Sequence, residues 1–181
     1  GLTQNLTADF TYNTDFAQVE VDSQQVNLTR FSLFFPEKRE FFLENKGIFA
    51  FGGNRGSPWG GGGDTPILFY SRRVGLNNGH EVPIKAGARL TGRIGPFTLG
   101  ALNIHAGEDL ASESPGTNFT VVRLRRDVLR KSSIGLIFTG RSAAQTSNGS
   151  NLAYGVDGRF AFFEDLTIDT FWASTRTRNL K

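Results

Sequence analysis

The chain has 181 residues with a net charge of +3, and it contains no cysteine. The lack of cysteine excludes disulfides, thiol catalysis and cysteine-ligated zinc. Acidic and basic residues interleave, which argues against a nucleic-acid partner. Only 38% of the residues are hydrophobic, although 17 are Phe. A membrane β-barrel with a hydrated interior fits this composition, and so does a phenylalanine-rich soluble β-sandwich.

A first strand is predicted within residues 1–13, where apolar and polar residues alternate from Leu2 to Tyr12. Side chains of a strand point alternately to its two faces, so this strand has one apolar and one polar side. Ile84–Ile94 and Leu152–Phe162 show the same alternation. Runs of about ten such residues have the length that a tilted strand needs to cross a bilayer.

Residues 14–66 are irregular, and we interpret them as an inward-folded, lumenal segment followed by a glycine-rich loop. The stretch from Val26 to Phe51 is rich in aromatic residues and carries charges throughout. Pro36 interrupts any continuous helix or central strand. We predict a strand up to Phe35, a sharp turn, and then an irregular or short helical piece. Gly52–Thr65 is predicted to be a flexible loop.

Residues 67–181 are predicted to form an antiparallel meander. It begins with a short strand, Ile67–Val74, which ends in paired arginines. Six longer strands follow at Val82–Ile94, Phe97–His105, Asn118–Asp127, Ser133–Ser142, Asn151–Phe163 and Leu166–Arg176. The alternation of Phe97–His105 is blurred by Leu102 and Ile104.

The connections between these six strands alternate strictly between short and long. Short connections are predicted at Gly95-Pro96, Val128–Ser132 and Glu164-Asp165, and longer polar ones at Ala106–Thr117 and Ala143–Ser150. In outer-membrane barrels, short turns lie on the periplasmic side and long loops lie outside. This sorting favours the barrel. A soluble sandwich would instead require the alternating strands to pack their apolar faces together in a dry core.

Residues 13–51, NTDFAQVEVDSQQVNLTRFSLFFPEKREFFLENKGIFAF, resemble the signature of a large family of predicted outer-membrane β-barrel proteins of unknown function. The later pieces FYSRRVG, IKAGARLTGRIGPFTLGALN and FTVVRLRRDVLRKSSIGLIFTGR resemble the same family in the same order. Its members occur in Bacteroidota and related Gram-negative phyla. They usually carry an N-terminal domain similar to family 9 carbohydrate-binding modules.

This resemblance implies an antiparallel transmembrane β-barrel, or part of a larger one, in the outer membrane of a Gram-negative bacterium. Members run several hundred residues past this region, so the chain would lack the carbohydrate-binding domain and the later strands. The first residue, Gly1, and the lack of methionine also lead us to expect a mature or internal piece of a longer protein. The chain offers about eight or nine strands, which can close a small barrel.

Ten charged residues precede, occupy or follow the FFPEKREFFLE segment, and two interpretations of them stay open. As a functional set, they form a charged constriction that selects solutes, as rings of charge do in pores. As a structural set, which we favour, carboxylates pair with arginines and hold the segment against the barrel wall, because buried charges need partners. The residues are Asp15, Glu20, Asp22, Arg30, Glu37, Arg39, Glu40, Glu44, Arg72 and Arg73.

Motifs for catalysis and cofactor binding are lacking. The chain contains no nucleophile elbow, zinc-protease helix, P-loop or dinucleotide fingerprint. His80 and His105 are isolated histidines, which argues against a metal site. No carboxylate spacing supports a glycosidase. We therefore expect no enzymatic activity, no catalytic residue and no cofactor.

Three functions remain after this elimination. The first is a porin-like barrel in the lipid bilayer that lets a small solute pass or captures it, the solute being saccharide-related. The second is a structural barrel subunit that scaffolds a larger assembly with other envelope proteins or with the rest of its own longer chain. The third is the non-catalytic part of a carbohydrate-active enzyme. An open polar lumen would favour transport, and a lumen blocked by the FFPEKREFFLE segment would favour the scaffold.

Overall fold

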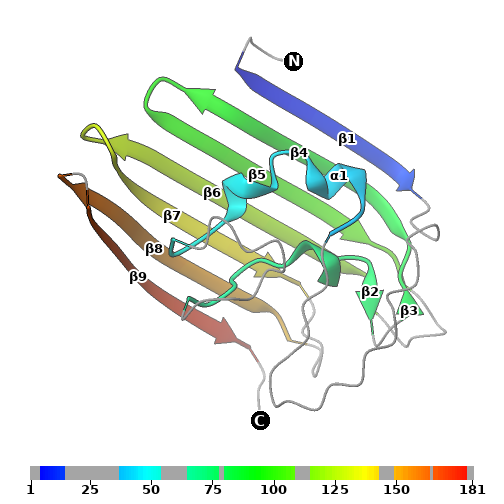
Figure 1. Ribbon diagram of the computed structural model, residues 1–181. Coiled ribbons are helices and arrows are strands. Elements are labelled where there is room, and N and C mark those ends of the chain that lie inside the picture. Colours follow the sequence, from blue (N-terminus) through cyan, green and yellow to red (C-terminus); the bar gives the residue numbers. More distant parts are fainter. Residues whose placement is uncertain are drawn as a thin grey trace.

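Seven strands in the described part of the chain form one antiparallel sheet in the order β1-β4-β5-β6-β7-β8-β9 (Figure 1). The computed structural model describes residues 5–14, 37–53, 65–77, 80–108, 115–142, 149–163 and 165–178. The strands are β1 (Leu6–Thr14), β4 (Ile84–Ile94), β5 (Phe97–Ala106), β6 (Thr117–Val128), β7 (Ser132–Arg141), β8 (Asn151–Phe162) and β9 (Leu166–Thr177). The prediction of an all-β antiparallel meander is confirmed, and each of the six longer strands lies within two residues of its expected bounds.

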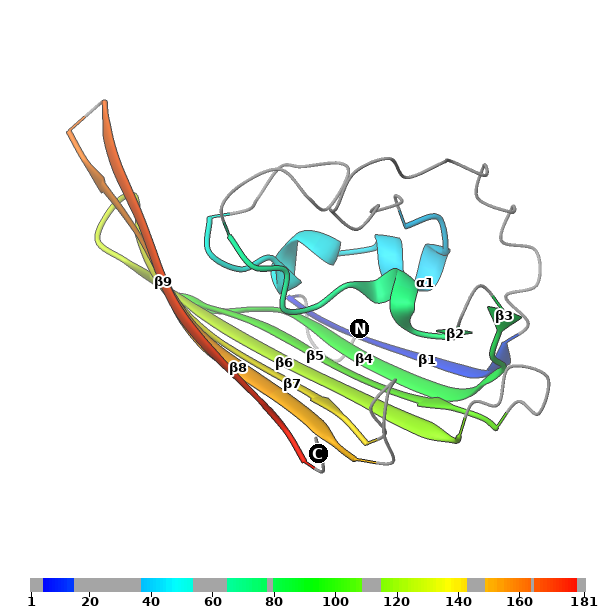
Figure 2. The same ribbon diagram turned by 90° about the horizontal axis from the view of Figure 1, so that it is seen from below.

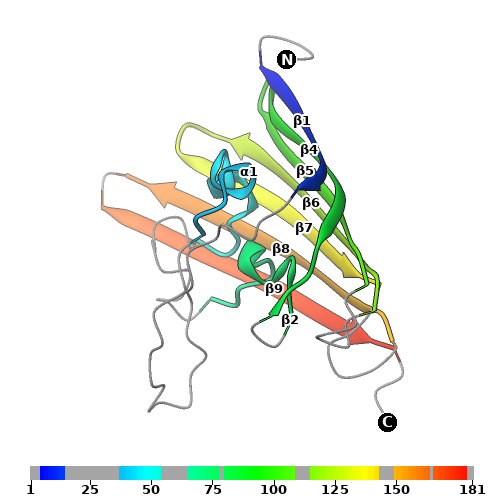
Figure 3. The same ribbon diagram turned by 90° about the vertical axis from the view of Figure 1, so that its right-hand side faces the viewer.

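The sheet is curved but not closed (Figures 2 and 3). β1 lies at one edge and β9 at the other, and within the described residues neither strand pairs on its outer side. β1 pairs with β4 rather than with a strand next to it in the sequence, and its register places Asp9 opposite Arg89. The structure therefore shows a curved wall, and it does not show a barrel.

A segment of short helical turns and extended chain lies across one face of this wall (Figure 2). We call it the inner segment; it comprises residues 37–53 and 65–75. It contains α1 (Glu40–Leu43) and two 3-10 turns, η1 (Lys46–Phe49) and η2 (Ser71–Arg73), and the two-residue strands β2 (Leu76–Asn77) and β3 (His80–Glu81) follow it. No helix in the described part of the chain is long and apolar enough to span a membrane.

Two expectations for this region have different outcomes. The irregular or short helical piece after Pro36 is confirmed by α1 and η1. The predicted strand Ile67–Val74 is wrong, because its backbone forms no ladder and ends in the η2 turn. Its carbonyl oxygens are used differently: the guanidinium of Arg39 donates to the oxygens of Ser71 at 2.7 Å and Val74 at 2.5 Å. The predicted strand up to Phe35 and most of the glycine-rich loop lie outside the described residues.

The apolar core lies between the inner segment and the sheet. Phe42, Phe49 and Val74 from the segment belong to one buried cluster with residues of β4, β5 and β6. Leu102 and Ile104 of β5, which blur the alternation of that strand, belong to this cluster and are 3% and 0% exposed. They point to the face that the segment covers. The blurred alternation thus marks the place where the segment packs.

Gly155 of β8 allows the segment to approach the wall closely. A Cβ atom at this position would lie 2.7 Å from a ring carbon of Phe51. The Phe51 ring also packs edge-on against Phe171 of β9, with 5.9 Å between the ring centres. Any larger side chain at Gly155 would displace this aromatic contact.

The opposite face of the sheet, which we call the bare face, is apolar. No element in the described part of the chain covers it (Figure 2). Because β4 and β8 lie in the same sheet, their apolar sides cannot pack against each other as a soluble sandwich would require. The large, exposed side chains of the bare face are Phe10, Tyr12, Ile94, Phe97, Val122, Ile134, Leu136, Phe138, Leu152, Tyr154, Val156, Phe162, Leu166, Ile168 and Trp172.

Candidate functional site

Arg89 on β4 joins the inner segment to two strands of the wall. Its side chain is 3% exposed. Nε and Nη2 donate to Asp9 of β1 at 3.1 and 2.7 Å, and Nη2 also donates to the Glu44 carboxylate at 2.5 Å. Nη1 donates to the carbonyl oxygens of Phe41 at 2.5 Å and Glu44 at 2.9 Å. All five N–H donors of the guanidinium therefore have an acceptor, which is what a buried charge requires.

Arg39 forms a second buried ion pair within the inner segment. Its Nε and Nη2 each donate to the Glu37 carboxylate at 2.8 Å, and the Ser71 hydroxyl donates to the same carboxylate at 2.6 Å. Burial raises the pKa of Glu37, but the hydrogen bonds and charge of Arg39, together with the Ser71 hydroxyl, outweigh it and leave this pKa below its ordinary value. The guanidinium also lies over the Phe42 ring, 4.3 Å from its centre. This pair fixes the two halves of the inner segment to each other.

A third ion pair lies on the wall itself, between Arg123 of β6 and Asp157 of β8. The guanidinium donates to the two carboxylate oxygens at 2.5 and 2.8 Å, a bidentate geometry. The backbone N–H of Gly52 donates to the same carboxylate at 3.1 Å, so the segment is attached here as well. Between the two partners, β7 carries Gly135, where a Cβ atom would lie 2.6 Å from Asp157 Oδ1. Only glycine leaves room for this pair.

A pocket of about 350 Å³ opens between residues 68–74 of the inner segment and the wall strands β6 to β9. It lies where β6 and β8 begin and β7 and β9 end, at the strand ends that are joined by the longer connections. Arg73 and Tyr70 line it from the segment, and Phe119, Arg141 and Asn151 line it from the wall. The guanidinium of Arg141 lies 5.1 Å from the centre of the Phe119 ring. Its Nε is buried and has no hydrogen-bond partner in the described part of the chain.

A family model described as a domain of unknown function (DUF5916) matches residues 1–91, which is half of the chain. The chain belongs to this family. The match includes the ion pairs centred on Arg39 and Arg89. The Arg123–Asp157 pair and the wall side of the pocket lie beyond it. Comparison of the chain with curated proteins and with solved structures gave no match.

The ten charged residues singled out in the sequence of this DUF5916 chain have different positions and partners. Asp15, Glu20, Asp22 and Arg30 lie outside the described residues. Glu37 and Arg39 pair with each other.

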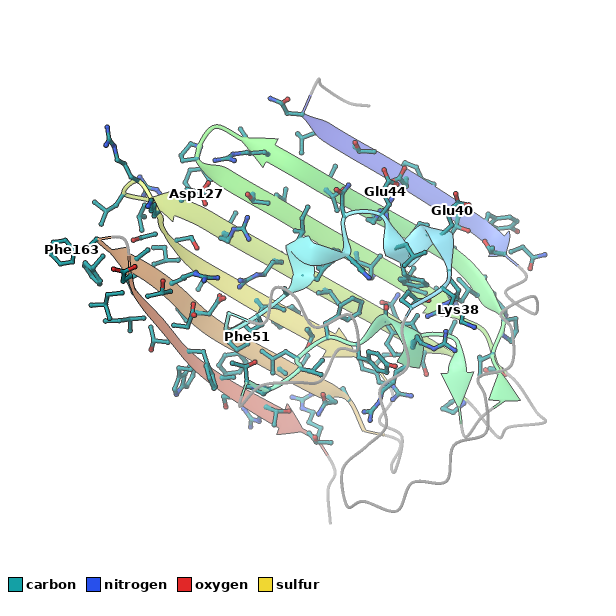
Figure 4. The ribbon with its side chains drawn as sticks, in the orientation of Figure 1. Lys38, Glu40, Glu44, Phe51, Asp127 and Phe163 are labelled. Carbon is teal, nitrogen blue, oxygen red and sulfur yellow. The ribbon has the colours of Figure 1, made fainter. Side chains whose placement is uncertain are left out.

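The remaining four of the ten lie on the inner segment, and Figure 4 labels two of them, Glu40 and Glu44. Glu44 binds Arg89, a residue outside the predicted set. Glu40 is exposed, Arg72 is 4% exposed, and Arg73 lines the pocket. Of the six predicted residues that the structure describes, Glu37, Arg39 and Glu44 thus take part in two separate ion pairs, and these six residues do not form one ring of charge.

Four partners of the segment escaped the sequence analysis: Asp9, Arg89, Arg123 and Asp157. Asp9, Arg89 and Asp157 lie on the polar sides of the three strands that were predicted to alternate, and Arg123 lies on the predicted strand Asn118–Asp127. An ionisable residue on that side, between two apolar neighbours, is the signal that could have found them. Their pairing could not be read from the sequence, because the bonded residues are 80 positions apart in one pair and 34 in the other.

Proposed function

We propose that this chain forms part of the wall of an outer-membrane β-barrel, with the inner segment on the lumenal side. The observation that carries the proposal is the inverted distribution of polarity across the sheet. Arg89 and Arg123 are 4% and 2% exposed on the covered face, whereas Phe10 and Trp172 are 81% and 58% exposed on the bare face. A contiguous apolar face of this kind is rare on soluble monomers and normal on a surface that contacts lipid.

Strand lengths agree with this proposal. β4, β5 and β7 have 11, 10 and 10 residues, which is the length needed by a tilted strand to cross the hydrocarbon core. In lipid, the free edges of β1 and β9 would leave backbone groups without partners. The barrel must therefore be closed by further strands, either from the same protein or from a second copy. A larger barrel of this kind also agrees with the family resemblance, because the members run several hundred residues past this region.

Within such a barrel, we assign to the chain the capture or passage of a small solute, without chemistry of its own. The pocket between the inner segment and the wall supports this assignment, because it combines aromatic, arginine and amide side chains. Sites for small polar molecules commonly have this mixture. Since the long connections of outer-membrane barrels face outward, the pocket would open toward the cell exterior.

A scaffold role is the second candidate, and one observation favours it. The inner segment is held on the wall by a buried apolar cluster, by the contacts of Arg89 with Phe41 and Glu44, and by the Gly52 N–H on Asp157, so it is a fixed part of the structure and not a gate. A barrel filled in this way could serve as an anchor for other envelope proteins.

Site-directed labelling tests the membrane wall. The chain contains no cysteine, so a single introduced cysteine can carry an environment-sensitive fluorophore. In vesicles, we expect a label at Leu136→Cys on the bare face to be quenched by a lipid-soluble quencher and a label at Ser133→Cys on the covered face to be protected. Equal quenching at both positions would exclude the membrane wall.

Conductance measurements distinguish passage from the scaffold role. The full-length protein is inserted into a planar bilayer, and ion and sugar flux are recorded. Passage predicts discrete conductance steps. An inserted protein without any conductance would contradict passage and would leave capture or the scaffold role.

A further inference from the structure

Arg73 and Arg141 differ from the three arginines that form the buried ion pairs. Arg39, Arg89 and Arg123 each bind a carboxylate at 2.8 Å or less. Arg73 of η2 and Arg141 at the end of β7 both line the pocket, and no acidic residue lines it with them in the described part of the chain. Two like charges thus face the same cavity.

Such an arrangement is unfavourable unless something compensates it. Like charges at close range repel each other, and the buried Nε of Arg141 has lost water without gaining a protein acceptor in the described part of the chain. An anion in the pocket would supply both the missing charge and the missing acceptor. The Phe119 ring supports the Arg141 guanidinium from one side, which holds its planar donors in a fixed direction.

The remaining lining indicates the kind of molecule that carries the anion. Tyr70 and Phe69 contribute aromatic rings to the lining, and Thr139 and Asn151 contribute polar groups. Asn151 Nδ2 donates to Thr177, so its Oδ1 and the Thr139 hydroxyl are the groups that can hydrogen-bond to hydroxyls of a ligand. The volume of about 350 Å³ lies at the small end of the range for small-molecule sites. This combination suits a compact polar ring that bears one acidic group.

We propose that the pocket binds a small organic oxyanion, a hydroxylated molecule with a carboxylate or phosphate group, with Arg73 and Arg141 on the acidic group. The inference rests on the proposed role in solute capture, because it names the class of the solute. Guanidinium groups suit both acids, since each presents two oxygens to the planar donor fork. The calorimetry described next distinguishes a carboxylate from a phosphate as the acidic group.

Titration calorimetry with the detergent-solubilised full-length protein tests the site. The probes are matched pairs: galacturonate against galactose, glucose 6-phosphate against glucose, and inorganic phosphate alone. We expect at least one acidic sugar to bind and its neutral partner to bind more than about tenfold more weakly, because a charge-assisted hydrogen bond is lost. The pair with the larger difference identifies the acid as carboxylate or phosphate.

Three variants locate the binding. Arg73→Gln and Arg141→Gln should each weaken the binding of the acidic sugar by about tenfold or more. Arg93→Gln is the control; it removes the same charge from an exposed ion pair with Asp127, near the short β4–β5 turn. Arg73 is exposed, so its variant should fold even where Arg141→Gln does not.

Several outcomes would overturn the inference. They are equal binding of acidic and neutral sugars, binding of phosphate alone as tightly as any sugar acid, equal weakening by all three variants, and no binding of any probe. None of these outcomes alters the labelling pattern expected for the membrane wall. Failure of the oxyanion site is therefore distinguishable from failure of the proposed function.

Discussion

Arg89 illustrates how a charge is made tolerable on the covered face. Its five donors are divided among two carboxylates and two backbone carbonyls. Removing a guanidinium of this kind leaves several acceptors without a donor at once. The surrounding residues come from β1, β4 and the end of α1, so one side chain determines how three elements meet.

Replacing Arg89 therefore tests whether the charges are structural. We expect Arg89→Gln to lower the free energy of unfolding by about 1–3 kcal/mol, because the carbonyl oxygens of Phe41 and Glu44 and the part-buried carboxylate of Asp9 lose their donor. Arg89→Lys should recover only part of this, since an ammonium cannot supply five planar donors. Chemical denaturation in phospholipid vesicles measures the change. The control is Arg93→Gln, which removes the exposed ion pair between Arg93 and Asp127 and should change the free energy of unfolding by about 1 kcal/mol or less.

Gly135 offers a test with a single added methyl group. In Gly135→Ala, the Cβ atom would lie 2.6 Å from Asp157 Oδ1 and 2.7 Å from both terminal nitrogens of Arg123. We expect a loss of about 1–3 kcal/mol in unfolding free energy, because the bidentate pair must move apart. Gly140→Ala on the same strand is the matched control, since its Cβ would meet nothing closer than 3.4 Å. Equal stability of the two variants would contradict a fixed Arg123–Asp157 pair.

At the scale of elements, the strands of the sheet and the short helical piece after Pro36 were predictable, and the conformation of Ile67–Val74 was not. Strands such as β4 and β8 are recognisable by the alternation of apolar and polar residues, since each has one face toward apolar and one toward polar surroundings. The short apolar run Ile67–Val74 has no such signature, and a run of this length fits a strand or a packed turn equally well. Its true conformation depends on Arg39, more than thirty residues earlier, which binds the carbonyl oxygens of its last residues.

The contacts of the candidate site also divide into local ones, which the sequence indicates, and long-range ones, which it does not. Pairing of Glu37 with Arg39 is local and was within reach of the sequence, which placed both in one charged set. The partners of Arg89 depend on β1 pairing with β4 across the whole inner segment. The pocket depends on both the segment and four wall strands. Neither the pairing of β1 with β4 nor the packing of the segment on these strands can be read from the local pattern of apolar and polar residues.

Docking of the inner segment should depend on pH through Glu37. Its pKa lies below the ordinary value, so its carboxylate stabilises the folded state above the unfolded pKa of about 4.5. This contribution is lost as the pH falls through the lowered, folded-state pKa. We expect hydrogen exchange of residues 37–53 to accelerate in that acidic range while the wall strands stay protected.

Glu37→Gln separates this carboxyl from the others. The variant should exchange faster at neutral pH, because Arg39 loses its charged partner, and it should lack the acid-induced step in this region. If the variant kept the same acid transition as the original protein, a different group would be responsible for it.

At the scale of the whole molecule, the decisive property is the direction in which the apolar side chains point. The face on which a water-soluble sheet would bury its core is covered by the inner segment, and the residues of the segment and of this face form three ion pairs and a small apolar cluster. The larger apolar surface remains on the outside, with Phe163, 91% exposed, at the tip of the β8–β9 turn (Figure 4). If the proposed membrane location is correct, we expect such a molecule to be stable in lipid, with its bare face against the acyl chains.

The energetic consequence of a charge on the bare face distinguishes lipid from water. Leu136 is 53% exposed at the middle of β7. In a bilayer, Leu136→Arg should lower the free energy of unfolding by about 2–4 kcal/mol, because the arginine lies near the midplane. Ile134→Arg, nearer the strand end on the same face, should have a smaller effect, falling toward about 0–1 kcal/mol at the interface. On a surface exposed to water, both substitutions would change stability by only about 0.5 kcal/mol. Denaturation of the two variants in vesicles therefore decides whether this wall stands in a membrane, and two equally small effects would exclude it.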